Sequence, residues 1–359
     1  MPEIVLENVV KKYGTTKAID NVSVTISEGE FCVIVGPSGS GKTTLLNLIS
    51  GFVMPDSGQI MIGRENVEKI PPRNRDIGMV FQDIGLFSHM TVRQNLEYGL
   101  KLRKTDKSVI QKQVNEIADK LKINQLLDKK PNMISGGEAQ RVAIGRTLIL
   151  DPPICLFDEP LGNLDANLRV EILEEIKYLH KSMGKTFVFV THDQEQALSA
   201  GTKIIVMKDG KIMQTGHPLE IYHNPQNRFV AEFFGISSMN LIAGRVVDLG
   251  GSVGFESEGM KVKLKDDLKQ YVGRRVFLAV RPLNIYLEDQ MHDVSGFGTV
   301  NLIEKLGDKN LVYLKVGGDQ KIVASTPPQH KYSLQDKIRI GFDADKLHIY
   351  DQEQGERLI

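Results

Sequence analysis

Cysteine is scarce in this chain of 359 residues, and neither sign of charge is in excess. The two cysteines, Cys32 and Cys155, each stand in an apolar, strand-like run, which predicts small buried residues in the core of a reduced, cytosolic protein. Lysine and arginine together number 45, as do aspartate and glutamate. The net charge of zero argues against nucleic acid as the main partner, although a local basic patch is compatible with it.

Long apolar runs and export signals are also missing. No apolar run approaches the roughly 20 residues that cross a bilayer, and residues 1–5 lack the charged and apolar regions of a signal peptide. Any membrane role is therefore expected to depend on a partner. No long-period repeat or low-complexity tract is present, and the length leaves room for two soluble domains.

What the sequence does contain is a glycine-rich loop between a strand-like run, residues 31–35, and a helix-like run, residues 45–50. This order is the context of a phosphate-binding P-loop. Its glycines let backbone N–H groups point at phosphate oxygens, beside a helix N-terminus that favours anions. Lys42 is expected to reach the β- and γ-phosphates, and the Thr43 hydroxyl to bind Mg²⁺. The loop comprises Gly36, Pro37, Ser38, Gly39, Ser40, Gly41, Lys42, Thr43 and Thr44.

A turn that merely joins strand to helix is the alternative reading of this loop, and the complete motif disfavours it. The surrounding patterns predict an α/β domain over residues 1–235, with a helical subdomain at about 84–152. Beyond 235, short alternating segments predict a small all-β domain, barrel or sandwich, over residues 236–359. Elements expected in the first domain are strands at 4–6, 22–26, 77–81, 154–157 and 186–190, a helix at 168–183 and a hairpin at 203–214.

Two acids end one of the predicted strands. Asp158 and Glu159 follow residues 154–157. Beside a P-loop, the first acid can hold Mg²⁺ and the second can polarise an attacking water as a general base. An incidental pair of surface acids is the alternative, which the nearby P-loop makes the weaker one.

Two further features carry less specific signals. Ser135, Gly136, Gly137 and Glu138 precede a helix-like run, and a serine with Glu three residues later is a capping box, so a plain helix start explains them. A Ser-Gly-Gly helix start also predicts an anion site, and with one P-loop in the chain it would serve a γ-phosphate held by another copy. His192, just after the run 186–190, suits a structural and a catalytic role equally.

In combination these motifs resemble the ATP-hydrolysing subunit of ABC transporters, over residues 4–235. The matching positions in chain order are Tyr13 (adenine stacking), residues 36–44 (Walker A), Gln82 (Q-loop), residues 134–141 (signature), Asp158 and Glu159 (Walker B), residues 162–165 (D-loop) and His192 (switch histidine). Ile134 and Glu138 stand where the signature usually has Leu and Gln, and Gly162 where the D-loop usually has Ser.

The resemblance implies an α/β P-loop ATPase that binds ATP and Mg²⁺ and works as a dimer, of two copies or of close paralogues, around two ATP molecules. It implies Glu159, His192 and Gln82 as catalytic residues and Thr43, Gln82 and Asp158 as metal ligands. The implied nucleotide-binding residues are those of the P-loop with Tyr13, Ser135, Gly136, Gly137, Asp158 and Asp165.

The C-terminal part resembles importer ATPases with OB-like TOBE lobes, through residues 224–231 and the pair Arg281-Pro282. Maltose-type sugar importers are the nearest match, and residues 238–240 look sugar-type, whereas Asn284 stands where many relatives have an acid nearby. This implies a subunit at the cytoplasmic face of the membrane, with a permease and, indirectly, an extracellular solute-binding protein as partners, and no nucleic acid.

The substrate stays open at this point. Polyamine, ferric-iron and oxyanion importers share the same engine. From another class, a soluble ABC ATPase of DNA repair or translation would carry a coiled-coil insertion or a second P-loop domain, and this sequence contains neither.

Overall fold

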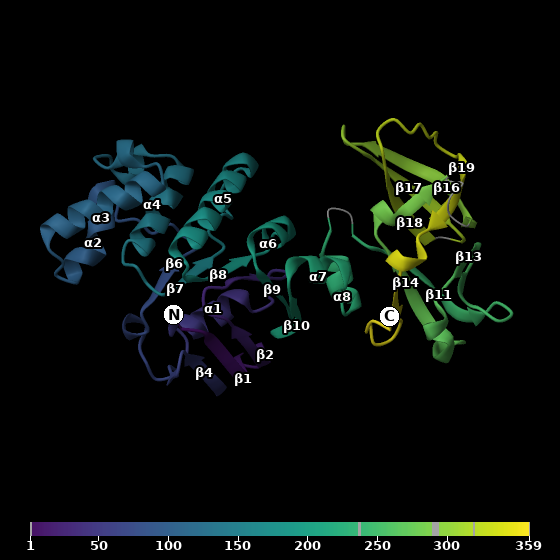
Figure 1. Ribbon diagram of the computed structural model, residues 1–359, viewed down its shortest axis with the longest axis horizontal. Coiled ribbons are helices and arrows are strands. Elements are labelled where there is room, and N and C mark those ends of the chain that lie inside the picture. The colour runs from purple at the N-terminus through teal and green to yellow at the C-terminus, as the bar shows by residue number, and fades with distance from the viewer. Residues whose placement is uncertain (1, 236–237, 289–293, 319, 359) are drawn as a thin grey trace. The chain divides into compact units, whose positions relative to one another are not determined.

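The chain forms two compact units, Met1–Ile221 and Tyr222–Ile359. The structure, a computed structural model, describes residues 2–235, 238–288, 294–318 and 320–358 (Figure 1). The first unit is an α/β P-loop fold and the second is a curled antiparallel β fold, so the predicted fold class is confirmed. Both cysteines are buried and free, as expected. Among the described residues, no helix is long and apolar enough to span a membrane.

The functional residues of the first unit depend on a six-stranded sheet in the order β10-β9-β3-β8-β7-β6. Strands β6, β7, β8, β3 and β9 pair in parallel, and β10 is antiparallel to β9. Their carboxyl ends therefore meet at one edge, where α/β sheets bind ligands. The bounds are β3 Phe31–Val35, β6 Ile77–Val80, β7 Ile154–Asp158, β8 Thr186–Thr191, β9 Lys203–Lys208 and β10 Lys211–Gly216.

The central strands are fully buried, which explains their uninterrupted apolar sequences. All five residues of β3 are buried, as are all five of β7 and all six of β8. Parallel strands covered on both faces show this pattern instead of alternation. The predicted hairpin around Asp209 and Gly210 is present as β9 and β10.

A second, antiparallel sheet of four strands has the order β2-β1-β4-β5. Its first strand, β1 (Ile4–Tyr13), is longer than the predicted strand at 4–6, because pairing with β2 (Thr16–Ile26) continues through register shifts up to Tyr13. The other strands are β4 (Ser57–Ile62) and β5 (Glu65–Asn66). Tyr13 is thereby placed at the end of a regular strand.

Six helices complete this unit, and three of them, α2, α3 and α4, pack on one another. The apolar stripe expected within 110–121 is the buried face of α3. Helix α1 ends at Gly51, where Arg75 donates to the carbonyl oxygens of Leu48 and Ile49 at 2.8 Å each. The bounds are α1 Lys42–Ser50, α2 Val92–Leu102, α3 Lys107–Lys120, α4 Gly136–Leu148, α5 Ala166–Met183 and α6 Gln194–Ala200, with 3-10 turns at Pro72–Asn74, Asn124–Leu126 and Pro131–Met133.

The second unit begins earlier than the expected boundary at 235, which adjoins residues 236–237, outside the described residues. Helix α8 (Arg228–Phe233) belongs to it because Ala231 shares a small core with Ala279 and Tyr350. The Tyr350 hydroxyl also donates to the Pro225 carbonyl at 2.9 Å. Helix α7 (Pro218–His223) contains the point of division.

Ten strands form the sheet of the second unit, around one continuous apolar core. The order is β15-β19-β16-β13-β12-β11-β14-β20, with β17 on β16 and β18 on β17. The bounds are β11 Asn240–Asp248, β12 Val253–Ser257, β13 Met260–Lys263, β14 Arg275–Val280, β15 Ile285–Leu287, β16 Val294–Lys305, β17 Asn310–Val316, β18 Gln320–Thr326, β19 Lys337–Phe342 and β20 His348–Asp351; 3-10 turns lie at Asp266–Tyr271, Pro282–Asn284 and Ala344–Lys346.

Candidate functional site

The glycine-rich loop leaves β3 and opens α1, so its backbone curls around the start of a helix. Gly41 has a φ of 101°, and a Cβ there would lie 2.4 Å from the Ala18 carbonyl oxygen. Inside the loop, the Lys42 Nζ donates to the carbonyl oxygens of Gly36 at 2.9 Å and Pro37 at 3.0 Å. Burial lowers the pKa of Lys42, against the raising effect of nearby carboxylates. The loop therefore places one cation at its centre, held by its own backbone.

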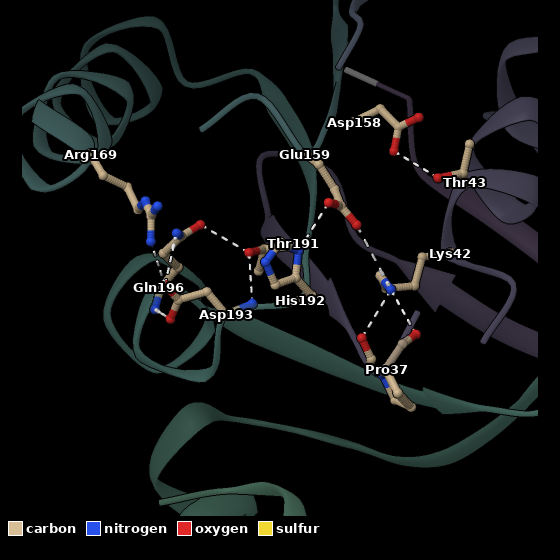
Figure 2. Close-up of polar contacts among 11 residues, drawn as sticks. Pro37, Lys42, Thr43, Asp158, Glu159, Arg169, Thr191, His192, Asp193 and Gln196 are labelled. Atoms are coloured by element: carbon tan, nitrogen blue, oxygen red, sulfur yellow. Dashed lines mark hydrogen bonds and ion pairs between the residues drawn. The ribbon is translucent and has the colours of Figure 1, made fainter. Parts of the chain in front are cut away.

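Asp158 and Thr43 meet at the edge of the sheet, as Figure 2 shows. The Thr43 hydroxyl, on the first turn of α1, donates to the Asp158 carboxylate at the end of β7 over 3.0 Å. Burial raises the pKa of Asp158, and the hydrogen bond from Thr43 opposes this. A hydroxyl and a buried carboxylate next to a P-loop form an oxygen donor set of the kind Mg²⁺ prefers.

Glu159 lies between the P-loop lysine and the histidine. Its carboxylate oxygens are 4.0 Å from the Lys42 Nζ and 2.9 Å from the His192 Nδ1 (Figure 2). The Glu159 backbone has φ 41°, a left-handed conformation that is uncommon for a residue other than glycine. Such outliers cluster at functional sites. The turn after β7 therefore points this carboxylate along the edge of the sheet toward the end of β8.

A second layer of polar contacts lies behind His192, and the sequence analysis missed it. The Thr191 hydroxyl contacts Gln196 Oε1 at 2.9 Å, and Gln196 Nε2 donates to Asp193 at 3.0 Å. Arg169 of α5 lies 3.6 Å from the same Asp193 carboxylate. Asp193 caps α6 by accepting from the backbone of residues 195 and 196. An Asp with Gln three residues later is a capping pattern, so the sequence carried a signal for part of this network.

Gln82 and Tyr13 are both exposed, Gln82 in a loop and Tyr13 as the last residue of β1. Gln82 follows β6, the neighbour of β7 in the sheet. The segment beyond it is held by Arg146 of α4, which donates to the carbonyl oxygens of Gly85 at 2.7 Å and Ile84 at 3.4 Å. Tyr13 is 52% exposed, with the Lys11 ammonium 5.6 Å from its ring centroid. Its ring face is thus accessible for stacking.

The predicted capping box at the start of α4 is present. The Ser135 hydroxyl accepts from the Glu138 N–H at 3.3 Å, and the Ser135 N–H donates to the Glu138 carboxylate at 2.8 Å. The latter bond is the main cause of the lowered pKa of Glu138. Glu138 therefore caps the helix, although the family usually has Gln at this position.

The two glycines of this motif have different surroundings. A Cβ at Gly137 would lie 2.2 Å from Leu168 Cδ2 on α5, whereas a Cβ at Gly136 would meet nothing within 4 Å. Nearby, Asp165 caps α5 by accepting from the Leu168 N–H at 3.0 Å. Across the part of the chain that the structure describes, no hydrogen bond or ion pair joins residues 135–137 to residues 36–44. A side chain at Gly137 would therefore force Leu168 to shift, whereas the space around Gly136 is open.

Arg141 is a further residue that the sequence analysis did not single out. From α4 it contacts Glu171 at 2.8 Å and Glu175 at 3.0 Å on α5. Burial raises the pKa of Glu175, and Arg141 opposes this. The signature helix is therefore tied to the helix that follows the Walker B strand. No motif pattern within one segment could have indicated this pairing.

Comparison with known proteins now identifies the family. Residues 19–162 match the family described as ABC transporter, and residues 278–349 match the TOBE domain. The maltose/maltodextrin import ATP-binding protein MalK of Photobacterium profundum is 40% identical over 98% of this chain and 96% of its own. The chain belongs to the ABC transporter family. It is an ABC-type ATPase, as the series of sequence motifs from the P-loop to His192 predicted.

Other relatives carry different substrate names. The sn-glycerol-3-phosphate import ATP-binding protein UgpC of Ruegeria pomeroyi is 40% identical over 100% of this chain and 99% of its own. The xylose/arabinose import ATP-binding protein XacJ of Haloferax volcanii is 39% identical over 99% and 95%. Similarity therefore extends over both units of this ABC protein.

Solved structures match mainly the ATPase part. A crystal structure of the ADP conformation of an ATP-binding cassette of an ABC transporter has a TM-score of 0.58 at 29% identity, over 65% of this chain and 98% of its own. A dimeric, post-hydrolysis cassette bound to ADP and phosphate has a TM-score of 0.55 at 35% identity, over 60% and 98%. This ABC ATPase therefore shares its fold with cassettes that bind nucleotide.

Proposed function

We propose that this chain is the ATP-hydrolysing subunit that energises import of a sugar through a partner membrane permease. The relatives named above, which are import ATP-binding proteins over the full length, support import, and two of their three names specify sugars. Those full-length matches disfavour a soluble repair or translation ATPase. A peripheral position at the cytoplasmic face of the membrane follows from such a partner, with an extracellular solute-binding protein acting indirectly.

The contact of Glu159 with His192 carries the mechanistic part of the proposal. A carboxylate beside a phosphate-binding loop can accept a proton from the water that attacks a γ-phosphate. His192, at 2.9 Å, orients that carboxylate and is positioned to hydrogen-bond the γ-phosphate. Lys42, which now donates to its own loop, turns its charge toward the β- and γ-phosphates, where it stabilises negative charge. Tyr13 stacks on the adenine through its exposed face.

The donor atoms present fit a magnesium ion. Among the described residues, no cluster of three His, Cys, Asp or Glu side chains could hold a metal alone. Mg²⁺ at nucleotide sites needs only one or two carboxylates besides phosphates and waters. Thr43, Asp158 and Gln82 would supply such oxygens, and the ion would neutralise phosphate charge there. The buried Ser40 hydroxyl, which has no hydrogen-bond partner among the described residues, is a further donor for the phosphates.

The open surroundings of Gly136 support a role across a dimer. Gly136 and Gly137 open α4 with backbone N–H groups in the first helical turn, which have no partner within the helix. Among the described residues, nothing links Ser135, Gly136 or Gly137 to the chain's own P-loop. A helix start binds an anion that approaches along its axis. In the proposed assembly these residues contact the γ-phosphate bound by the other copy, with Asp165 near the same interface. Two copies, or this chain and a close paralogue, therefore enclose two ATP molecules.

The segment after Gln82 is the proposed docking surface for the permease. It includes residues 87–100, where the rings of Phe87 and Tyr98 contact each other in a tilted arrangement, with 4.7 Å between centroids, and Tyr98 is exposed. Phe81, just after β6, and Phe52, just after α1, are also exposed. Their ring centroids lie 5.8 Å apart. Exposed aromatic side chains are typical of protein interfaces.

Nucleotide-driven dimerisation tests the composite site. Glu159→Gln chains should bind ATP, fail to hydrolyse it and form dimers visible by light scattering. Adding Gly136→Asp should prevent the dimer while monomers still bind ATP, because a carboxylate at an open helix start repels the phosphate. Gln111→Asp, on the exposed face of α3, is the matched control and should leave dimerisation intact. Dimers that form equally with Gly136→Asp would contradict the shared site.

Co-purification tests the transport assignment. The tagged chain, captured from its own membranes, should bring an integral-membrane permease with it. In proteoliposomes, the ATPase rate of that complex should rise with a sugar-loaded binding protein. If a polyamine, ferric iron or an oxyanion stimulates the ATPase rate in place of the sugar, the substrate belongs to that class instead.

A further inference from the structure

A cavity of about 350 Å³ lies within the second unit, and none of the predicted nucleotide-site residues lines it. It is formed by segments around residues 223–224, 264–268, 281–284, 344–349 and 357, all of them within Tyr222–Ile359. Small-molecule sites in proteins have volumes of this order. The proposed ATPase activity gives this cavity no role.

The cavity concentrates positive charge. Arg281 and Arg357 both line it, and among the described residues neither has a carboxylate within ion-pair distance. Arg281 is 5% exposed and is fixed by donating to the carbonyl oxygens of Phe234 and Tyr222. Arg357 is half-buried, and one of its terminal nitrogens donates to Asn224 Oδ1 at 3.3 Å. A buried cation such as Arg281 is costly without a counter-charge, so proteins normally pair it. An anion in the cavity would supply the missing partner.

The acid on the cavity wall does not offset this charge. Asp345 is already paired with Lys265 at 3.0 Å, and both side chains are largely exposed at the rim. Lys346 lines the same rim, as does the exposed imidazole of His223. The interior therefore faces two guanidinium groups and one buried histidine, His348.

Two polar atoms in this wall lack partners. The Nδ1 of His348 and the Nε of Arg357 are buried without a hydrogen bond. His348 is 9% exposed, and burial together with the charges of Arg357, Arg281 and His223 lowers its pKa to about 4. Most buried polar groups in folded proteins are satisfied, so two orphans on one cavity wall indicate a ligand. A neutral imidazole N–H and a guanidinium N–H are both donors, as an anion requires.

We propose that this cavity binds the phosphate group of a small phosphate monoester, with Arg357, Arg281 and His348 as its anion-recognising residues. Guanidinium groups suit phosphate oxygens because of their charge and planar donor geometry. Leu264, Leu268 and Leu347 form an apolar part of the same wall. The cavity is larger than a bare phosphate, and this wall accommodates the ester's organic body.

Isothermal titration of the full chain with inorganic phosphate tests the site. A saturating, non-hydrolysable ATP analogue occupies the P-loop together with its γ-phosphate position, so that the remaining binding reports on the second unit. We expect saturable binding with a Kd at or below about 1 mM. Arg357→Met should weaken it at least about tenfold and His348→Phe at least about fivefold, whereas Arg357→Lys should retain most of it. Thermal unfolding verifies that each variant is folded.

The matched control is Arg245→Met, which removes the same charge from an exposed position on β11 outside the cavity. It should leave phosphate binding unchanged. No saturable binding to the wild type, or equal loss in Arg245→Met and Arg357→Met, would overturn the site.

A second titration identifies the source of the phosphate. A hexose 6-phosphate should bind at least as tightly as inorganic phosphate, because the apolar wall contacts its carbon skeleton, and the neutral hexose should not bind. Binding of phosphate with rejection of the ester would overturn the monoester assignment. Binding of the neutral hexose alone would overturn the anion site itself.

Discussion

The nucleotide site of the first unit and the cavity of the second unit use charge in opposite ways. At the sheet edge, Glu159 lies 4.0 Å from Lys42 and 2.9 Å from His192, so the cation is balanced within the chain. In the cavity, Arg281 and Arg357 have no such carboxylate among the described residues. The first arrangement is built for chemistry on a bound substrate. The second is incomplete without an anion.

The two regions also differ in how the chain assembles them. The P-loop is one continuous segment, and Gln82, Glu159 and His192 follow closely on parallel strands that share an edge. The cavity is made from five segments that antiparallel pairing and 3-10 turns bring together. Continuous motifs with a chemical requirement are visible in sequence, whereas a site of dispersed residues is visible only after folding.

The largest expected effect concerns Glu159, whose balance with Lys42 and His192 defines the first region. Glu159→Gln should lower ATP turnover about 10²–10⁴-fold, because an amide cannot accept the proton of the attacking water. The ATP dissociation constant should change only a few-fold, since the P-loop contacts remain. Steady-state hydrolysis and calorimetric titration measure the two quantities separately.

The control for this variant is Glu174→Gln, an exposed acid on α5. It should leave both turnover and ATP affinity unchanged. If the ATP turnover of Glu159→Gln in the assembled transporter is close to that of the wild type, Glu159 is not the general base.

The fold of this region and its local motifs could be predicted from the sequence for a physical reason, whereas the roles of the individual site residues stay predictions. Phosphate binding demands glycines with left-handed φ, a lysine and a hydroxyl at fixed spacing, and the strands beside them must be continuously apolar. Even the capping box at Ser135 is a local pattern that the structure retains. What sequence did not reveal are contacts between distant segments, such as Arg141 with Glu171 and Glu175.

The second unit was predicted only at the level of its class. Alternating apolar residues indicate strands, yet they do not determine which strands pair. The Arg281-Pro282 pair was noted as a family resemblance, and its burial beside the cavity emerged from the fold. The same holds for His348, whose sequence neighbours give no sign of a buried, unpartnered nitrogen.

Two variants, each expected to affect one site and spare the other, sharpen the comparison of the two regions. Lys42→Ala should weaken ATP binding at least about 100-fold, because Lys42 is the side-chain cation of the P-loop. In the same protein, phosphate binding to the second unit should persist. Arg357→Met should do the reverse and spare ATP affinity. Loss of both ligands in either variant, with the protein folded, would show that the two sites are not independent.

Acidification should destabilise the second unit through His348. The folded-state pKa of about 4 lies below the ordinary value near 6.5, so below pH 6.5 the unfolded chain binds a proton that the folded chain does not. Stability should therefore fall as the pH falls from 6.5 toward 4, by about 2 kcal/mol between pH 7 and pH 5. Hydrogen exchange of the backbone amides in β14 and β20 measures this loss of stability. His348→Phe should remove this contribution, and His330→Phe, at an exposed position, should not.

The smallest effect separates a glycine required by the fold from one required by a ligand. Gly136→Ala should leave the free energy of unfolding unchanged or raise it by up to about 1 kcal/mol, because its Cβ enters open space and alanine favours the helix. Gly137→Ala should be net destabilising by about 1 kcal/mol, since its Cβ would meet Leu168 Cδ2 at 2.2 Å. Urea unfolding followed by circular dichroism measures both, and Leu168→Ala combined with Gly137→Ala should relieve the clash.

Gly136→Ala should still slow ATP turnover, because the methyl group stands where the other copy's phosphate approaches. Equal destabilisation by the two variants, or full turnover in Gly136→Ala, would contradict a ligand-binding role for Gly136 and indicate a structural one.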